Sequence, residues 1–155
     1  MHRLVIRDAV AGDLPQLAEL ALRSKAHWGY EASLLASMRE ELSWDTDDLA
    51  RLCIRVGHVD EDRVGFHAVE DLGDGRAELE ALFVSPEHIG TGIGRRLMID
   101  ARRQAQELGC GVLVIQSDPH AERFYLRAGA RRVGERPSAS IPGRTLPLLE
   151  LDVRA

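Results

Sequence analysis

Three glycines at alternate positions, Gly90, Gly92 and Gly94, stand between an apolar run and a segment with helical periodicity. The apolar run ends at Ser85-Pro86, because proline has no N–H to donate to a sheet. From Ile93 onward apolar residues recur every three or four positions, as on one face of a helix. Glycines at such a turn let an anion approach the free N–H groups of a helix N-terminus. The stretch therefore predicts a strand, a phosphate-binding turn and a helix.

The spacing of these glycines excludes two common phosphate-binding turns. A dinucleotide-binding turn needs a third glycine where this chain has Leu97. A P-loop needs Lys and then Ser or Thr after its last glycine, whereas Arg95-Arg96 follow Gly94 here. A different phosphate-containing ligand is therefore expected.

The turn resembles the coenzyme A signature of the GNAT superfamily of N-acetyltransferases, Arg/Gln-x-x-Gly-x-Gly/Ala preceded by a strand and Val-x-Pro. Val84-Ser85-Pro86 and Gly92-Ile93-Gly94 match this signature, and Ile89 departs from it at the Arg/Gln position. Downstream, the stretch 118–130 resembles a second GNAT segment, Asn-x-x-Ala-x-x-Phe-Tyr-x-x-x-Gly-Phe. Its matching residues, in order, are Ala121, Phe124, Tyr125 and Gly129.

The resemblance implies that acetyl-CoA is the co-substrate and that no metal is needed. It implies that an amine attacks the acetyl group directly in a ternary complex, and that Tyr125 is the general acid beside the coenzyme sulfur. A core aromatic residue is the alternative reading of Tyr125. The expected coenzyme contacts are Leu82, Phe83, Val84, Ile89, Gly90, Thr91, Gly92, Ile93, Gly94, Arg95, His120 and Phe124.

Acetyl transfer to an amine also requires a base. An alkylamine with a pKa of about 10.4 costs roughly 4.6 kcal/mol to deprotonate at pH 7. Glu78 and Glu80 are two apart on a predicted strand and so share one face, which indicates a polar cleft or a solvated sheet edge. The resemblance places the base at either position in different members. Glu80 is preferred because it is nearer the acetyl end of the strand, and Glu78 is the alternative.

Acceptor selection is expected in the stretch 24–30, which is dense in polar and aromatic residues. Lys25, His27, Trp28 and Tyr30 are the candidate acceptor contacts, and Lys25 would suit an acceptor with a carboxylate. Alternatively, the two rings only join a helix pair. The loop 137–144 is expected to close over the same cleft.

Composition sets the broad class. The chain has 155 residues, 45% hydrophobic and 29% charged, with a net charge of −5, which suits one globular domain over residues 1–155. It has no broad basic field for nucleic acid, no membrane-length apolar run and no recognisable signal peptide, so a cytoplasmic location is expected. Cys53 and Cys110 are expected to be free thiols, and no zinc spacing is present.

The predicted elements follow the order β-α-α-β-β-β-α-β-α-β-β. This is also the order of the GNAT fold, an α/β (α+β) fold with a mixed, mostly antiparallel sheet of about seven strands and about four helices. Helices are predicted from about 13 to 22, from 31 to 42, after Gly92, and from 118 to Gly129. Residues 45–48 are predicted to be a solvated loop or another helix cap.

The predicted function is acetyl transfer from acetyl-CoA to a primary amine of a small molecule. The alternatives are a protein or peptide N-acetyltransferase and a non-catalytic acyl-CoA-binding regulatory module. Because related folds often form dimers, a homodimer is one expectation; the sequence identifies neither the acceptor nor the oligomeric state.

Overall fold

The computed structural model describes residues 3–139 and 141–154 and contains one seven-stranded sheet with the order β1-β2-β3-β4-β5-β7-β6. All neighbouring strands are antiparallel except β4 and β5, which are parallel. The predicted mixed, mostly antiparallel sheet is therefore confirmed. The strands are β1 (Leu4–Asp8), β2 (Cys53–Val59), β3 (Asp62–Asp71), β4 (Arg76–Val84), β5 (Val112–Gln116), β6 (Arg131–Pro137) and β7 (Thr145–Asp152).

Five α-helices lie in the described residues, one more than the sequence predicts: α1 (Leu14–His27), α2 (Ala32–Met38), α3 (Thr46–Arg51), α4 (Ile93–Glu107) and α5 (Glu122–Arg127). The additional helix is α3, where the side chains of Asp45 and Asp48 each accept a hydrogen bond from the other's backbone N–H. The second predicted helix is too long, because α2 ends at Met38 rather than near Leu42. A 3₁₀ turn, Pro119–Ala121, precedes α5.

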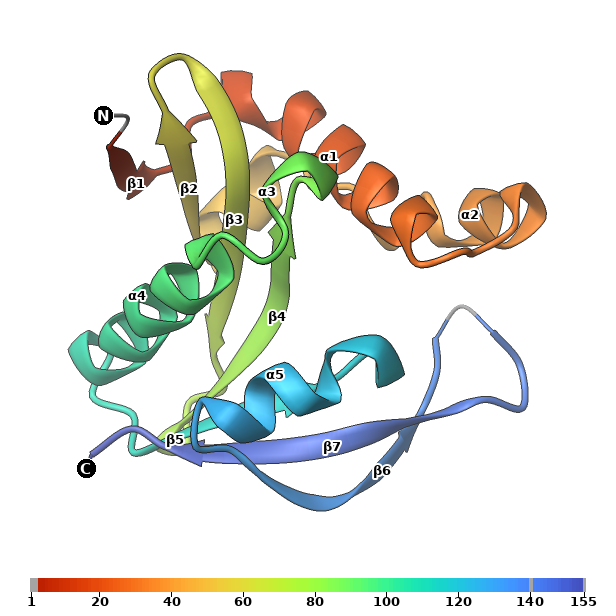
Figure 1. The fold of residues 1–155 in the computed structure, drawn as a ribbon. Coiled ribbons are helices and arrows are strands. Elements are labelled where there is room, and N and C mark those ends of the chain that lie inside the picture. The colour runs from red at the N-terminus through yellow and green to blue at the C-terminus, as the bar shows by residue number, and fades with distance from the viewer. Residues whose placement is uncertain (1–2, 140, 155) are drawn as a thin grey trace.

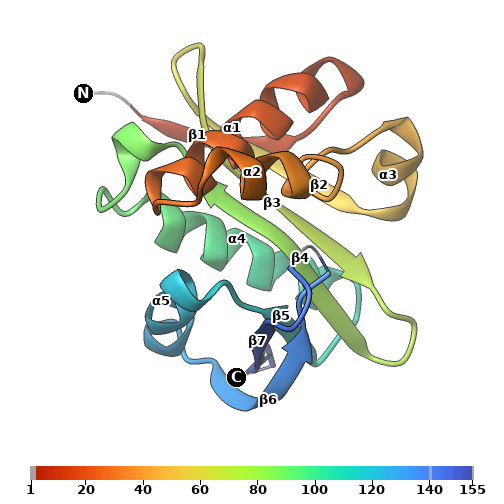
Figure 2. The ribbon, with the colours of Figure 1, turned by 90° about the vertical axis from the view of Figure 1, so that its right-hand side faces the viewer.

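The sheet opens between its two parallel strands. β4 pairs with β5 only over Arg76–Leu79, so residues 80–84 of β4 have no partner strand on that side. In Figure 1 and Figure 2, β4 leaves the β5–β7–β6 group and follows β3 and β2 instead. Unpaired backbone groups need other hydrogen-bond partners, such as a ligand. The gap therefore marks a place where a ligand can bind between the two parts of the sheet.

A β-bulge lies on β4 at the start of this gap. Ala68 pairs with Ala81 and Val69 pairs with Leu79, so Glu80 is an extra residue on β4. Before the bulge, Leu79 belongs to the core cluster under α4, and after it Ala81 belongs to the cluster under α1. A bulge of this kind changes the direction of the side chains that follow. Here it accompanies the divergence of β4 from β5.

Two hydrophobic clusters cover opposite faces of the sheet. One joins α4 and Tyr125 of α5 to β3, β4, β5 and β7, and the other joins α1 and Met38 of α2 to β2, β3 and β4. Ile141, in the loop between β6 and β7, packs against the second cluster. This contact brings the β6–β7 loop to the α1–α2 side, as Figure 1 shows.

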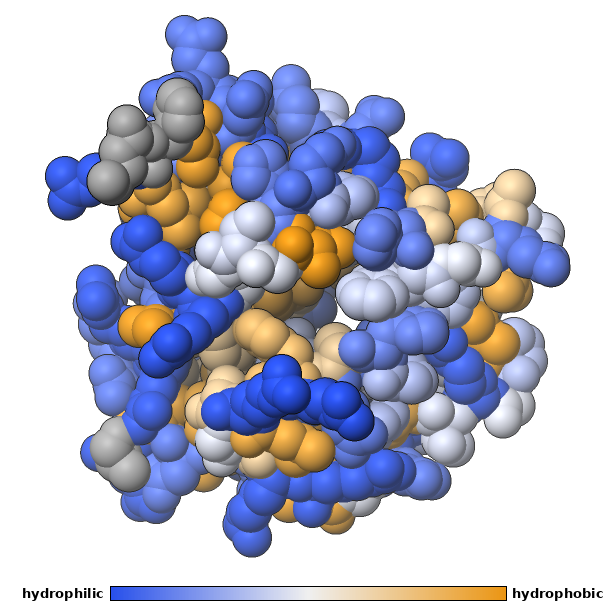
Figure 3. All heavy atoms as spheres, viewed as in Figure 1, coloured by the Kyte–Doolittle hydropathy of each residue, from blue (hydrophilic) through white to orange (hydrophobic). Residues whose placement is uncertain are grey.

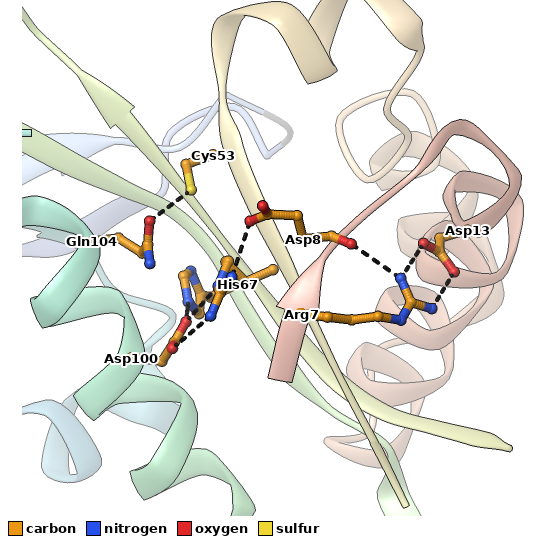
Figure 4. A network of polar contacts seen from close by, with 8 residues as sticks. Arg7, Asp8, Asp13, Cys53, His67, Asp100 and Gln104 are labelled. Atoms are coloured by element: carbon orange, nitrogen blue, oxygen red, sulfur yellow. Dashed lines mark hydrogen bonds and ion pairs between the residues drawn. The ribbon is translucent and has the colours of Figure 1, made fainter. Parts of the chain in front are cut away.

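A buried polar network joins α4 to the sheet (Figure 4). His67 of β3 is fully buried, and its Nε2 lies 2.8 Å from Oδ2 of Asp100 on α4. Arg55 of β2 donates to both oxygens of Asp100 at 3.0 and 3.1 Å. Burial alone would raise the pKa of Asp100, but the hydrogen bonds from His67 and Arg55 outweigh burial and hold that pKa well below its usual range. The carboxylate is therefore ionised, and His67 donates from Nε2.

Candidate active site

A cavity of about 760 Å³ runs through the gap between β4 and β5. On the α4 side it is lined by the glycine turn and by Phe124 and Tyr125 of α5, and on the α1–α2 side by Met38, Leu42 and Trp44. Figure 3 shows the α4 side, where pale and orange residues lie in a hollow surrounded by hydrophilic blue ones. Two reactants can therefore enter from opposite faces and meet beside β4.

The α4 end of the cavity is built as an anion site. Gly92 caps α4 with a φ of 88°, a left-handed conformation that glycine adopts without steric cost. The first hydrogen bond of the helix runs from the N–H of Arg96 to the carbonyl of Gly92, so the preceding N–H groups have no helical partner. Arg95 lines the cavity beside them. The free N–H groups and the helix dipole favour a phosphate at this position.

Gly94 is needed for a close approach between elements. A Cβ atom at this position would lie 3.3 Å from the Phe124 ring and 3.5 Å from the Val84 side chain. By contrast, no atom lies within 4 Å of the Cβ position of Gly90 or Gly92, so both glycines face open space. This open turn fits the phosphates of coenzyme A, and the unpaired edge of β4 offers hydrogen bonds to its amide-containing arm.

Tyr125 is buried in the core and also lines the cavity. Its hydroxyl makes no hydrogen bond to the protein within residues 3–139 and 141–154. The ring of the neighbouring Phe124 lies edge to face with the Tyr125 ring, with 5.2 Å between the centroids. Burial, and to a lesser degree the charge of Asp118, raises the pKa of Tyr125 above its usual value. The phenol is therefore protonated at neutral pH and is available as a proton donor.

Glu80 borders the cavity at the β4 bulge, where Arg51 of α3 holds it. Arg51 Nη1 lies 3.3 Å from Glu80 Oε2 and 2.8 Å from Glu70 Oε2. Partial burial raises the pKa of Glu80, and the hydrogen bond from Arg51 opposes this rise. A carboxylate with a raised pKa is a stronger base than an ordinary glutamate.

Glu78 also lines the cavity, but its ion pair comes from the other part of the sheet. Arg136 of β6 donates to Glu78 Oε1 at 3.1 Å and to Gln116 Oε1 at 3.2 Å. Both glutamates therefore face the cavity, as their spacing predicts, although the bulge places Glu80 outside the regular pairing of the strand.

The α1–α2 side of the cavity contains a chain of polar contacts between three distant segments. Lys25 Nζ lies 2.7 Å from Asp118 Oδ2, and Tyr30 donates to the same oxygen at 2.8 Å. Arg144 then donates to the Tyr30 hydroxyl at 2.9 Å. We name Lys25, Tyr30, Asp118 and Arg144 the acceptor-side cluster. It joins the end of α1, the loop after β5 and the β6–β7 loop.

Most of the predicted site residues lie on the cavity wall. Tyr125, Glu78 and Glu80 do so, as do Lys25 and Trp28 and ten of the predicted coenzyme contacts: Leu82, Phe83, Val84, Ile89, Gly90, Gly92, Gly94, Arg95, His120 and Phe124. Thr91 does not: its hydroxyl hydrogen bonds to the carbonyl of His88. Ile93 belongs to the core cluster that contains Leu97.

Two predicted acceptor residues have other positions. His27 does not line the cavity, and Tyr30 contributes through Asp118 and Arg144 rather than from the wall itself. Trp28 stacks on His120, with ring centroids 5.5 Å apart, so it contacts the turn before α5 rather than joining α1 to α2. Lys25 lines the cavity and is paired with Asp118, so its charge is already balanced within the protein.

Several wall residues carried no signal in the sequence. Met38, Leu42 and Trp44 reach the cavity because of how the segment 38–46 folds. Arg51 and Arg136 do not line the cavity, but they form ion pairs with Glu80 and Glu78 from positions far away in the sequence. The capping pattern Asp45-x-x-Asp48 was the one local hint of α3. In the described residues no cluster of His, Cys, Asp and Glu side chains could hold a metal ion, and none of the helices there is long and apolar enough to cross a membrane.

Comparison with known proteins identifies the class. Residues 15–130 match the acetyltransferase (GNAT) family, so the chain belongs to this family and is an acetyl-CoA-dependent acetyltransferase. No curated protein matches the sequence.

Solved structures share the fold across nearly the whole chain. The PaiA N-acetyltransferase of Thermoplasma acidophilum, in complex with coenzyme A, has a TM-score of 0.78 and 18% identity, with 97% of this chain and 99% of that chain covered. YncA, a putative acetyltransferase of Salmonella typhimurium with acetyl-CoA, has a TM-score of 0.70 and 20% identity over 97% and 94%. The ribosomal-protein-S18-alanine N-acetyltransferase of Escherichia coli has a TM-score of 0.72 and 17% identity over 97% and 94%. At these identities the likeness supports the fold alone.

Proposed function

We propose that this acetyltransferase acetylates the primary amine of a small molecule. The observation that carries the proposal is the acceptor-side cluster, because it joins three segments across the acceptor end of the cavity. Ile141 adds an apolar contact between the β6–β7 loop and the α1 side. A bridged cavity suits a small acceptor, whereas a peptide needs an open groove along which its chain can continue.

Each side chain has a defined role in the proposed reaction. The glycine turn and Arg95 hold the phosphates of acetyl-CoA, and the free edge of β4 offers N–H groups to the carbonyl oxygen of its acetyl thioester. Glu80 removes a proton from the bound ammonium group, directly or through a water molecule. Tyr125 donates its proton to the departing sulfur. With an ordinary thiol pKa of about 8.5, this last step needs only modest help.

A thiol-release assay with acetyl-CoA and a panel of amines tests the proposal. Small amines should release thiol in stoichiometric amounts with acetylated product, and peptides with a free N-terminus or a lysine should release little. Faster release with peptides would favour the protein-acetylating alternative. Tight binding of acetyl-CoA with no release for any acceptor would favour a non-catalytic acyl-CoA-binding module. The neighbour from Escherichia coli makes the peptide arm necessary, because its name describes a protein substrate.

A further inference from the structure

Arg144 is the one member of the acceptor-side cluster whose charge has no counter-ion in the part of the chain that the structure describes. Lys25 and Asp118 form an ion pair with each other, and Tyr30 is a neutral link between Asp118 and Arg144. Counting one negative and two positive groups, the cluster has a net charge of +1. The guanidinium therefore lies in the cavity wall as an uncompensated cation.

One N–H group of Arg144 is also left unsatisfied. Its Nε atom is buried and has no hydrogen-bond partner among the described residues. Buried donors in folded proteins are nearly always paired, so an unpaired one at a cavity wall calls for an explanation. Because Nε itself is shielded from the cavity, an anion would bind the part of the guanidinium that lines the wall and would supply the missing counter-charge there.

The position of the guanidinium is fixed before any ligand binds. It lies over the Tyr30 ring, 5.5 Å from the ring centroid, and donates to the Tyr30 hydroxyl. The backbone carbonyl of Arg144 accepts from the N–H of Ser138 at 2.7 Å, which closes the base of the β6–β7 loop. A fixed planar guanidinium matches the two oxygens of a carboxylate better than a flexible ammonium does.

The surroundings of Arg144 identify which reactant supplies the anion. The phosphate-binding turn and Arg95 lie at the α4 end, whereas Arg144 belongs to the loop that packs against the α1–α2 side through Ile141. The cavity wall also carries the apolar side chains of Trp44 and Leu146 and the carboxylates of Glu41, Glu78 and Glu80. The wall therefore offers a cation for an acceptor carboxylate, an apolar surface, and carboxylates for an acceptor ammonium.

We propose that the acceptor is an amine that also carries a carboxylate, as an amino acid with an apolar side chain does, and that Arg144 binds this carboxylate. The inference rests on the proposed function and narrows its acceptor class. In this arrangement the acceptor ammonium faces Glu80, and the apolar part contacts Trp44. The role that the sequence suggested for Lys25 is thus transferred to Arg144.

Matched pairs of acceptors test this proposal: phenylalanine against phenethylamine, and leucine against isoamylamine. Within each pair the carboxylate is the only group removed, but its removal also raises the pKa of the amine, so the comparison between wild type and Arg144→Gln carries the test. Wild-type protein should prefer the amino acid by at least about tenfold in kcat/KM, since charge-assisted bidentate hydrogen bonds are strong. Arg144→Gln should lower kcat/KM for the amino acid by about tenfold to a hundredfold through KM, and change the decarboxylated amine by less than about threefold. Arg131→Gln, on exposed β6, is the control and should change neither.

Three outcomes would overturn the proposal. The first is equal kcat/KM of wild type for both members of each pair. The second is an equal loss of kcat/KM for both members in Arg144→Gln. The third is a raised KM for acetyl-CoA in Arg144→Gln, which would mean that Arg144 binds the coenzyme instead. Arg144→Lys keeps the positive charge and should retain part of the preference for the amino acid over the decarboxylated amine. It also provides a second test if Arg144→Gln does not fold.

A binding measurement separates this inference from the proposed function. Amino acids should quench tryptophan fluorescence in wild type with acetyl-CoA absent, and the quench should be lost in Arg144→Gln. A quench without thiol release from any small amine would support the carboxylate site and contradict the proposal that small-molecule amines are the acceptors. Thiol release from simple amines without a quench by amino acids would do the reverse.

Discussion

Glu80 Oε2 lies 3.3 Å from Arg51 Nη1, so the carboxylate at the β4 bulge borders the cavity and is held by an ion pair. Glu78 is held in the same way by Arg136, at 3.1 Å. Each candidate base therefore has an arginine partner, and the two differ in their position along β4. Glu80 is on the unpaired part of the strand, where the proposed reaction takes place, whereas Glu78 is on the part that pairs with β5.

Replacing Glu80 should therefore remove the base. At pH 7, Glu80→Gln is expected to lower kcat/KM for the amine by about a hundredfold or more. The loss should shrink as the pH approaches the pKa of the amine, about 10.4, because free amine then needs no base. Wild type should lose activity in acid as Glu80 is protonated, over a range set by its raised pKa. Glu78→Gln is the matched control and should keep the wild-type pH–rate profile. If Glu78→Gln changed the profile and Glu80→Gln did not, Glu78 would be the base instead of Glu80.

Tyr125→Phe tests the proton donor. Because the hydroxyl makes no hydrogen bond within the described residues, its removal should leave the free energy of unfolding nearly unchanged. We expect kcat to fall by about tenfold to a hundredfold with acetyl-CoA affinity retained. Turnover equal to that of wild type would show that Tyr125 has only a packing role.

The parts of the site that the sequence predicted are those encoded by neighbouring residues. A glycine turn between a strand and a helix, and Phe124-Tyr125 on the helix that follows β5, can be read from local spacing. Arg144 and Tyr30 are 114 positions apart, and no local pattern indicates that they touch. Likewise, nothing in Glu78–Glu80 indicates the bulge, because the register depends on β3 as well. Lys25 lines the cavity, but its pairing with Asp118 depends on the tertiary fold and could not be predicted from local sequence.

Gly92→Ala tests the phosphate-binding turn. An alanine at a φ of 88° should destabilise the fold by about 1–2 kcal/mol, and its methyl group would occupy the open space on the cavity side. Gly73→Ala is a suitable control, because Gly73 has a φ of 86°, is equally open and lies outside the cavity. Both variants should lose similar stability, but only Gly92→Ala should weaken acetyl-CoA binding, by about tenfold or more. Calorimetric titration measures the difference; equal affinities would argue against phosphate binding at this turn.

The Asp100 network predicts how stability depends on pH. Asp100 has a lowered pKa in the folded protein, so its contribution is fully present above its unfolded value of about 3.9 and is lost as the pH falls below it. Burial lowers the pKa of His67 in the folded protein, although Asp100 opposes this effect. As the pH falls below about 6.5, His67 is therefore protonated in the unfolded chain before it is protonated in the folded protein, which lowers the free energy of unfolding. The free energy of unfolding should therefore decline in two stages, the first as the pH falls below about 6.5 and the second as it falls below about 3.9.

Asp100→Asn tests this assignment. It leaves His67 and Arg55 without their shared carboxylate and should destabilise the protein by about 3 kcal/mol at pH 7. The second stage in the fall of the free energy of unfolding should become smaller in this variant, because the carboxyl group of Asp100, which has a lowered pKa, has been removed. Asp74→Asn, in an exposed ion pair with Arg76, should cost much less stability and alter the pH profile much less, because solvent screens the pair. Denaturant unfolding from about pH 2 to pH 8 measures both effects. Equal losses in the two variants would mean that the buried network contributes no more than a surface pair.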